Sequence, residues 1–336
     1  MICKWHLVFV CLIIAILNIP ANGQEAPGKY DLSFSIVGGG MYGYTLYRLE
    51  HMQLVPETDW SIGVKSELQF PLDMMLAGFR LQLDKRASKG IPWSLSIEYL
   101  TNLNDPHGAM EDTDWIIYST YDYFKDMKFS YTKSDVDLVS HFAEAILSIP
   151  VLSKNKFQFT AVGGFQYRRY SFNVYGVDGW YINSQGRQIN FVDYQNDKVG
   201  KYRAIYMIPY LGLGGELHYS KNTVYLLAKA TPFVFADDFD DHLLRFKTGE
   251  GDCSGMFLAV ESGVDWLLTK GDNLSNWAIE IRAEYSLIST NGEQIQTWYG
   301  DDPASEADDT GESMTLDDYD MASKTLMFKA RLKYNF

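Results

Sequence analysis

The stretch Leu326-Met327-Phe328-Lys329-Ala330-Arg331-Leu332-Lys333-Tyr334-Asn335-Phe336 closes the chain and decides the fold. Its even positions are Leu, Phe, Ala, Leu, Tyr and Phe, whereas its odd positions include two lysines, an arginine and an asparagine. A period of two residues is typical of a β-strand with one apolar face and one polar face. In a membrane barrel, the apolar face meets lipid and the polar face lines the interior. The segment therefore predicts a membrane-facing strand.

Similar alternating runs recur along the whole chain. They lie near 30–48, 62–83, 92–103, 133–148, 156–174, 203–218, 223–235, 255–269, 277–290 and 324–336. The connections between them alternate in length. Those near 84–91, 149–155, 219–222 and 270–276 are short, whereas those near 49–61, 104–132, 175–202, 236–254 and 291–323 are long. Short turns at one end and long loops at the other are typical of bacterial outer-membrane barrels. The sequence thus predicts an all-β, ten-stranded antiparallel transmembrane β-barrel with long outer loops, which is too narrow for a wide aqueous channel.

The amino terminus reads as a signal peptide over residues 1–23. Lys4 gives a positive start, the run from Leu7 to Leu17 is apolar, and Pro20-Ala21-Asn22-Gly23 ends the segment with small residues. The apolar run is too short to span a bilayer comfortably, so cleavage is expected. The barrel should then occupy residues 24–336, and a terminal Phe336 resembles the signal by which outer-membrane proteins engage the barrel-assembly machinery. Cys253 is the one cysteine of the expected mature chain, so an internal disulfide is excluded.

The charge balance restricts the partners. The chain has 43 acidic and 29 basic residues, a formal net charge of −14. Such an excess disfavours nucleic acid and favours cationic peptides or proteins. The loop from Asp301 to Asp320 is rich in acids; it can be read as an attractor of cationic substrates or as a solvated, flexible loop.

Two acidic clusters in the predicted outer loops are candidates for chemistry. One is Asp237-Asp238-Phe239-Asp240-Asp241-His242, and the other is Glu111-Asp112-Thr113-Asp114-Trp115. Asp240 with His242, and Asp112 with Asp114, have the spacing that puts two side chains on one face of an extended segment. If the two loops meet, the four side chains could hold a water from which His242 accepts a proton. Without such a meeting, each cluster is a solvated acidic loop.

The strand before the dyad contains a conflict of phase. Lys229 implies that odd positions face the interior, yet Asp238, Asp240 and His242 are even. The sequence therefore predicts a bulge or change of direction near Pro232.

Other chemistries find less support in the sequence. Carboxylates with one histidine can bind a hard divalent cation, but no metal motif has the required spacing, and no metal is expected. The G-x-S-x-G motif of serine hydrolases is absent from the sequence.

Four motifs on this ten-strand plan resemble the omptin family of outer-membrane proteases from Gram-negative bacteria. The motifs are Met110-Glu111-Asp112-Thr113-Asp114-Trp115, Gln166-Tyr167-Arg168-Arg169-Tyr170-Ser171-Phe172, Ile208-Pro209-Tyr210-Leu211-Gly212-Leu213 and Asp238-Phe239-Asp240-Asp241-His242. The resemblance covers essentially the whole expected mature chain. It implies an aspartic-type endopeptidase at the bacterial outer membrane, with its active site facing outside.

The resemblance also assigns roles to residues. Asp112 with Asp114 would be the catalytic Asp couple, Asp240 with His242 the Asp–His dyad, and Asp238 a contact for a basic side chain of the substrate. A glutamate that lines the same basic pocket in omptins is replaced by Tyr47 here.

The lipid contacts of the family match less closely. Omptins need lipopolysaccharide, and Arg169 matches one lipid-binding position, whereas Phe165, Tyr167 and Ile205 replace an aromatic, an acidic and a second basic residue. The expected activator is lipopolysaccharide or another outer-membrane lipid, with no other cofactor. The alternative function is a non-catalytic adhesin or ligand-binding barrel on the same scaffold.

Overall fold

A computed structural model describes residues 30–54, 61–85, 91–119, 126–183, 185–220, 222–268, 277–303 and 308–336. The predicted signal peptide at 1–23 lies outside these ranges. No helix in the described part of the chain is long and apolar enough to cross a membrane.

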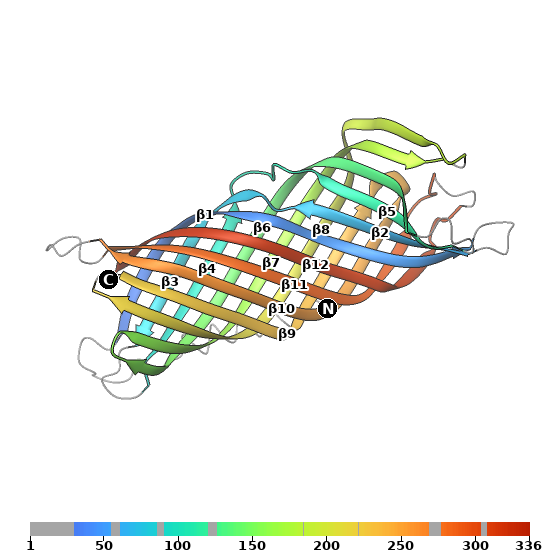
Figure 1. The fold of residues 1–336 in the computed structure, drawn as a ribbon. Helices are drawn as coiled ribbons and strands as arrows, with labels where there is room; N and C mark the ends of the chain where they lie inside the picture. The colour runs from blue at the N-terminus through green and yellow to red at the C-terminus, as the bar shows by residue number, and fades with distance from the viewer. Residues whose placement is uncertain are drawn as a thin grey trace.

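The chain forms one closed antiparallel sheet (Figure 1). Its strands are β1 (Tyr30–Leu54), β2 (Ser61–Pro71), β3 (Met74–Lys85), β4 (Trp93–Asn102), β5 (Met110–Ser119), β6 (Met127–Lys154), β7 (Phe157–Ile182), β8 (Gln188–Tyr219), β9 (Asn222–His242), β10 (Lys247–Leu267), β11 (Trp277–Trp298) and β12 (Ser313–Asn335). Pairing of β12 with β1 closes the ring. Both β2 and β3 pair with β1, and both β4 and β5 pair with β6, so the twelve strands fill ten positions. The predicted ten-stranded fold is confirmed.

The long connections differ from the prediction. Much of what was expected to be outer loop is strand that continues beyond the predicted boundary: β7 runs to Ile182, β8 starts at Gln188, and β12 starts at Ser313. The acidic loop expected over Asp301–Asp320 is therefore partly strand. The strands extend this far because the two strands of a hairpin satisfy each other's backbone N–H and C=O groups, whether or not a membrane surrounds them. We call the end of the barrel that carries the β7–β8, β9–β10 and β11–β12 hairpins the long-hairpin end. The carboxy terminus lies at the other end (Figure 1).

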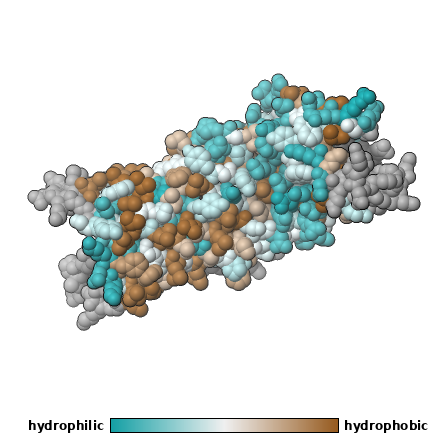
Figure 2. Space-filling view, in the orientation of Figure 1, coloured by the Kyte–Doolittle hydropathy of each residue, from teal (hydrophilic) through white to brown (hydrophobic). Residues whose placement is uncertain are grey.

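The alternation of the closing strand is confirmed. Lys329 and Arg331 are buried in the interior, whereas Leu326, Phe328 and Leu332 are exposed on the outside. Exposed apolar residues gather over the part of the barrel nearer the carboxy terminus, and polar residues cover the opposite part (Figure 2).

The outward-facing rows show where the apolar surface stops. The exposed residue changes from Phe235 to Asp237 on β9 and from Met256 to Ser254 on β10. It changes from Leu287 to Ser289 on β11 and from Leu326 to Lys324 on β12. The segments beyond this line, toward the long-hairpin end, lie outside the expected membrane.

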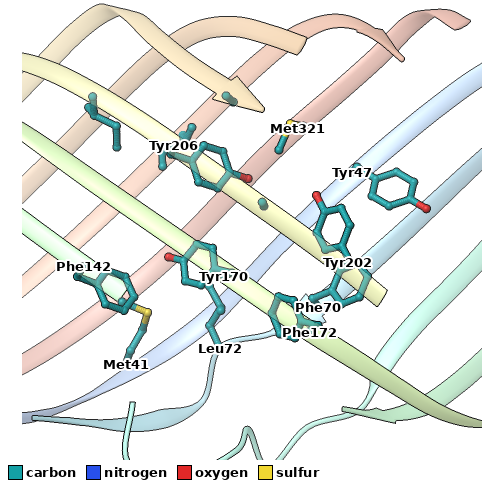
Figure 3. Packing of buried hydrophobic residues seen from close by; sticks show 14 of the residues in the cluster. Met41, Tyr47, Phe70, Leu72, Phe142, Tyr170, Phe172, Tyr202, Tyr206 and Met321 are labelled. Carbon is teal, nitrogen blue, oxygen red and sulfur yellow. The ribbon is translucent and has the colours of Figure 1, made fainter. Parts of the chain in front are cut away.

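The interior has two levels. Nearest the middle it contains buried charged residues, including Lys229, Glu261, Glu284, Lys329 and Arg331. Above them, toward the long-hairpin end, packs a cluster of aromatic rings (Figure 3). Phe70 stacks on Tyr202 with ring centroids 4.3 Å apart, and Tyr202 lies 5.2 Å from Tyr47. This aromatic cluster supports the site described next.

Candidate active site

Asp240 and His242 lie at the end of a strand, and the prediction of a long loop over 236–254 is wrong. Asp240 pairs with Tyr202 of β8 on one side and with Gly249 of β10 on the other. The chain then reverses in a 3-10 turn at Leu243–Arg245 before β10 begins. Ladder hydrogen bonds on both sides therefore hold this pair more rigidly than a loop would.

A β-bulge near Pro232 turns the acidic side chains inward, as the sequence predicted. The register between β9 and β10 shifts between Gly255 and Phe257. Odd residues such as Lys229 are buried before the shift, and even residues such as Asp238 are buried after it. The one extra residue thus resolves the conflict of phase.

The Asp240 and His242 side chains contact each other. Nε2 of His242 lies 2.7 Å from Oδ2 of Asp240, which is only 5% exposed, whereas the imidazole remains partly open to solvent. The hydroxyl of Tyr47 also donates a hydrogen bond to Oδ2 of Asp240. Burial alone would raise the pKa of Asp240, but His242, the Tyr47 hydrogen bond and the charge of Lys247 together lower it. Asp240 is therefore a carboxylate that orients the imidazole.

Asp112 and Asp114 lie on β5, and the expectation that they sit in a loop is also wrong. Asp114 is held at both oxygens: Ser66 donates to Oδ1 at 2.6 Å and Ser130 to Oδ2 at 2.5 Å. Asp112 differs, because its Oδ1 is buried and has no hydrogen-bond partner. Burial first, and then the charges of Asp114 and Asp240, raise the pKa of Asp112 well above its usual value. Asp112 is thus the member of the pair that tends to keep a proton.

The structure brings the two acidic clusters to one site. Asp112 pairs with Leu68 of β2, and Leu68 pairs with Tyr47 of β1, whose hydroxyl reaches Asp240. The negative charge of Asp240 contributes to the raised pKa of Asp112. The four residues singled out in the sequence therefore face the same space inside the long-hairpin end.

Asp238 lies one step deeper on the same face of β9. Its Oδ2 accepts a hydrogen bond from the Tyr319 hydroxyl, while its Oδ1 is buried without a partner. Burial raises the pKa of Asp238 to about 7, with a further contribution from Asp240, although the Tyr319 hydrogen bond opposes the shift. Gly251 faces this carboxyl, and a Cβ there would collide with Oδ1 of Asp238. Asp238 is thus an acceptor with one oxygen free for a donor.

Sequence reasoning missed Lys247 as a site residue. It lies directly across the ladder from His242, is 7% exposed, and donates to Oε1 of Gln296 at 2.9 Å. Burial, followed by the charge of Arg245, lowers the pKa of Lys247 to about 8, although Asp240 and Asp112 act in the opposite direction. The alternation of β10 could have placed Lys247 inside, but only once the turn at Leu243–Arg245 was known.

Arg168 and Arg169 point to opposite sides of β7. Arg168 is buried and donates to Gln166 and Ser286 in the interior. Arg169 is partly exposed, and its Nε donates to the Ser171 hydroxyl at 3.3 Å. It shares the outward row with Tyr167, so Arg169 is the member of the pair that can reach a lipid headgroup.

The arrangement can move protons at a bound water. A histidine oriented by a carboxylate can accept a proton, and a protonated carboxyl opposite can donate one. Within the described ranges, no group of three or more His, Cys, Asp or Glu side chains is placed to hold a metal ion.

Comparisons with known proteins agree with this architecture. The sequence model of the Omptin family matches residues 43–286. The outer membrane protease OmpP of Escherichia coli strain K12 is 28% identical over 166 residues, which cover 47% of this chain and 50% of OmpP. The matched region thus spans about half the length of that relative. The crystal structure of the outer membrane protease OmpT from Escherichia coli superposes with a TM-score of 0.71 at 18% identity, covering 91% of this chain and 97% of OmpT.

Proposed function

The chain belongs to the omptin family, and on this premise we propose that it is an outer-membrane endopeptidase that activates water with Asp112, Asp114, Asp240 and His242. One observation carries the proposal: Asp240, which contacts His242 at 2.7 Å, lies near enough to Asp112 for its charge to raise the pKa of Asp112, a carboxyl with a buried and unpartnered oxygen. A buried acceptor without a partner is costly unless a ligand or water satisfies it. A water at Asp112 would lie between the two halves of the site.

The proposed reaction begins when His242 takes a proton from this water. Asp240 stabilises the resulting imidazolium, and the water oxygen bonds to the peptide carbonyl carbon. Asp112 donates a hydrogen bond to the oxygen that becomes negative, because its raised pKa lets it keep a proton. Collapse of the tetrahedral intermediate breaks the C–N bond, and His242 returns its proton to the leaving amine. The charge of Asp114, which Ser66 and Ser130 hold in place, helps to keep this proton on Asp112.

The proposed substrates are cationic peptides or proteins. The free, buried Oδ1 of Asp238 is an acceptor that a basic side chain could satisfy. The formal net charge of −14 would attract such substrates over a longer range. Because Tyr47 contributes no second acid, we expect a preference for a basic residue near the cleavage site without a strict requirement for a dibasic pair.

The proposed setting is the bacterial outer membrane, with the long-hairpin end outside. The apolar outer rows would face lipid, and Arg169 would contact the phosphate of lipopolysaccharide or of another outer-membrane lipid that activates the enzyme. The chain would be exported with residues 1–23 as its signal, and residues 24–336 would be inserted by the barrel-assembly machinery through the closing strand.

The test is cleavage of a quenched peptide library by protein refolded in detergent, with and without lipopolysaccharide. The proposal expects cleavage that His242→Ala and Asp112→Asn each abolish. Two variants are matched controls and should keep activity: His218→Ala changes a histidine at the other end of the barrel, and Glu111→Gln changes the exposed neighbour of Asp112 that pairs with Lys133. Folded wild-type protein that cleaves nothing under any lipid condition would contradict the proposal and favour a non-catalytic surface adhesin.

A further inference from the structure

The hydroxyl of Tyr47 is placed against both members of the Asp240–His242 pair. It donates a hydrogen bond to Oδ2 of Asp240 and lies 3.5 Å from Nε2 of His242. The same Oδ2 accepts the contact from His242. We infer that Tyr47 is a positioning residue for this pair: its hydroxyl fixes the carboxylate of Asp240, which in turn fixes the imidazole. The inference rests on the proposed function for its catalytic consequence.

The ring of Tyr47 is immobilised by its surroundings. It is 1% exposed and packs 5.2 Å from the ring of Tyr202 and 5.7 Å from that of Tyr319, measured between centroids. Its backbone is paired on both sides, with Met321 of β12 and Leu68 of β2. In Figure 3 its hydroxyl points away from the neighbouring aromatic rings. A ring so fixed holds the hydroxyl oxygen beside Asp240, to which the hydroxyl donates.

A neutral donor suits the charges that surround Asp240. Asp240 interacts, through its charge or a hydrogen bond, with groups from five strands. They are His242 and Asp238 of its own strand, Tyr202 of β8, Lys247 of β10, Asp112 of β5 and Tyr47 of β1. An acidic side chain at position 47 would add a further negative charge beside two carboxyls. Tyr47 instead donates a hydrogen bond without adding charge. Burial and the nearby Asp240 raise the pKa of Tyr47 well above its usual value, so the hydroxyl keeps its proton.

Removing the hydroxyl should therefore change the protonation of Asp240 as well as its orientation. The Tyr47 hydrogen bond is one of the interactions that lower the pKa of Asp240. In Tyr47→Phe the ring still packs, but the carboxylate loses a donor and its pKa rises. Asp240 then protonates at a higher pH and stops orienting the imidazole at a higher pH.

The kinetic test compares Tyr47→Phe with Tyr170→Phe. Tyr170 is also fully buried among aromatic rings, but its hydroxyl has no hydrogen-bond partner and lies outside the site. For Tyr47→Phe we expect kcat to fall about 10- to 100-fold, as for loss of a hydrogen bond to a charged group, with KM within about twofold. The acid limb of the pH profile should move to higher pH. Tyr170→Phe should change neither quantity, and an unchanged kcat and pH profile in Tyr47→Phe would overturn the inference.

A second measurement does not depend on cleavage. Carboxyl ¹³C resonances of aspartate-labelled protein in detergent micelles report each titration, and Asp240→Asn identifies the resonance of Asp240. We expect Asp240 to titrate at a higher pH in Tyr47→Phe than in the wild type and in Tyr170→Phe. If the wild type cleaves nothing, the proposed function fails, yet this titration still decides whether Tyr47 controls Asp240. The same titration of Asp240 in all three proteins would overturn the inference.

Discussion

The middle of the barrel and its long-hairpin end both contain buried carboxylates, but among the described residues only those in the middle each contact a cation. Lys229 lies within 3.0 Å of Glu144, Glu261 and Glu284. Arg331 lies 2.6 Å from Glu98, which Lys329 also contacts at 2.9 Å. We call these paired buried charges the plug, and the loss of one member of a pair should destabilise the fold.

The long-hairpin end has the opposite balance. Among the described residues there, the buried cation Lys247 acts on Asp112 and Asp240. Oδ1 of Asp112 and Oδ1 of Asp238 are buried without a hydrogen-bond partner. A fold tolerates such a cluster only if the rest of the structure supports it, and unbalanced buried acids are typical of sites that act on a ligand. Burial of charge alone therefore does not identify a site in this barrel, whereas buried acids that lack balancing cations do.

Removal of Lys229, the cation at the centre of the plug, should have the largest effect on stability. Lys229→Met would leave three glutamates without their shared partner, because the Lys229 side chain is fully buried among them. We expect the free energy of unfolding to fall by about 3–5 kcal/mol. Denaturant titration of the refolded barrel measures this. Activity per folded molecule should persist, and a loss below ~1 kcal/mol would contradict the structural role of the plug.

The buried acids of the site should make the stability of the protein depend on pH. Asp238 has a pKa of about 7 in the folded chain, against ~3.9 in an unfolded one. Between these values the folded state holds a proton that the unfolded state has lost, so this group makes the protein less stable as the pH rises from about 4 to about 7. Asp238→Asn cannot titrate, and its stability relative to the wild type should rise by about 1–3 kcal/mol over that window.

Unfolding curves at several pH values measure this difference. Glu250→Gln, which changes an exposed carboxyl on β10, is the control and should follow the wild type. Identical pH dependence in Asp238→Asn and the wild type would show that Asp238 does not carry a raised pKa.

Removal of Lys247, the buried cation of the site, should have a smaller effect, and that effect should be on activity. Lys247→Gln removes a positive charge that acts on both Asp240 and Asp112. We expect kcat/KM to fall about tenfold, the change produced by ~1.4 kcal/mol, and the acid limb to move to higher pH. Lys201→Gln is the control, because Lys201 is an exposed lysine paired with Asp241. Equal activities of the two variants would show that Lys247 does not contribute to the reaction.

The sequence predicted the barrel because alternation is a local signal. Each strand carries its own period of two, and the closing strand buries Lys329 and Arg331 as expected. The bulge near Pro232 was predictable for the same reason, since the phase of the buried positions changes across it. The ends of the strands were not predictable, because strands beyond the apolar surface need no lipid-facing row.

The site was predictable only in part. Asp240 with His242, and Asp112 with Asp114, have a local spacing that a reader of the sequence can see. The contact of Tyr47 with Asp240 joins residues separated by 193 positions, and no local pattern contains it. Lys247 depends on a tight turn where a loop was expected. Such residues become visible only when the register of the closed sheet is known.

Two isosteric variants, Asp240→Asn and Glu284→Gln, test most directly whether the site and the plug have separate roles. Glu284 accepts from Lys229 at 2.7 Å in the plug, and Asp240 contacts His242 at 2.7 Å in the site. For each variant, kcat/KM per folded molecule and the free energy of unfolding are measured on the same preparation. We expect Asp240→Asn to lose activity by about 10³-fold or more, as when a catalytic base is disrupted, while its stability changes little. We expect Glu284→Gln to lose stability and to keep its activity per folded molecule. An active Asp240→Asn variant, or a loss of stability alone in both, would contradict the division between site and plug.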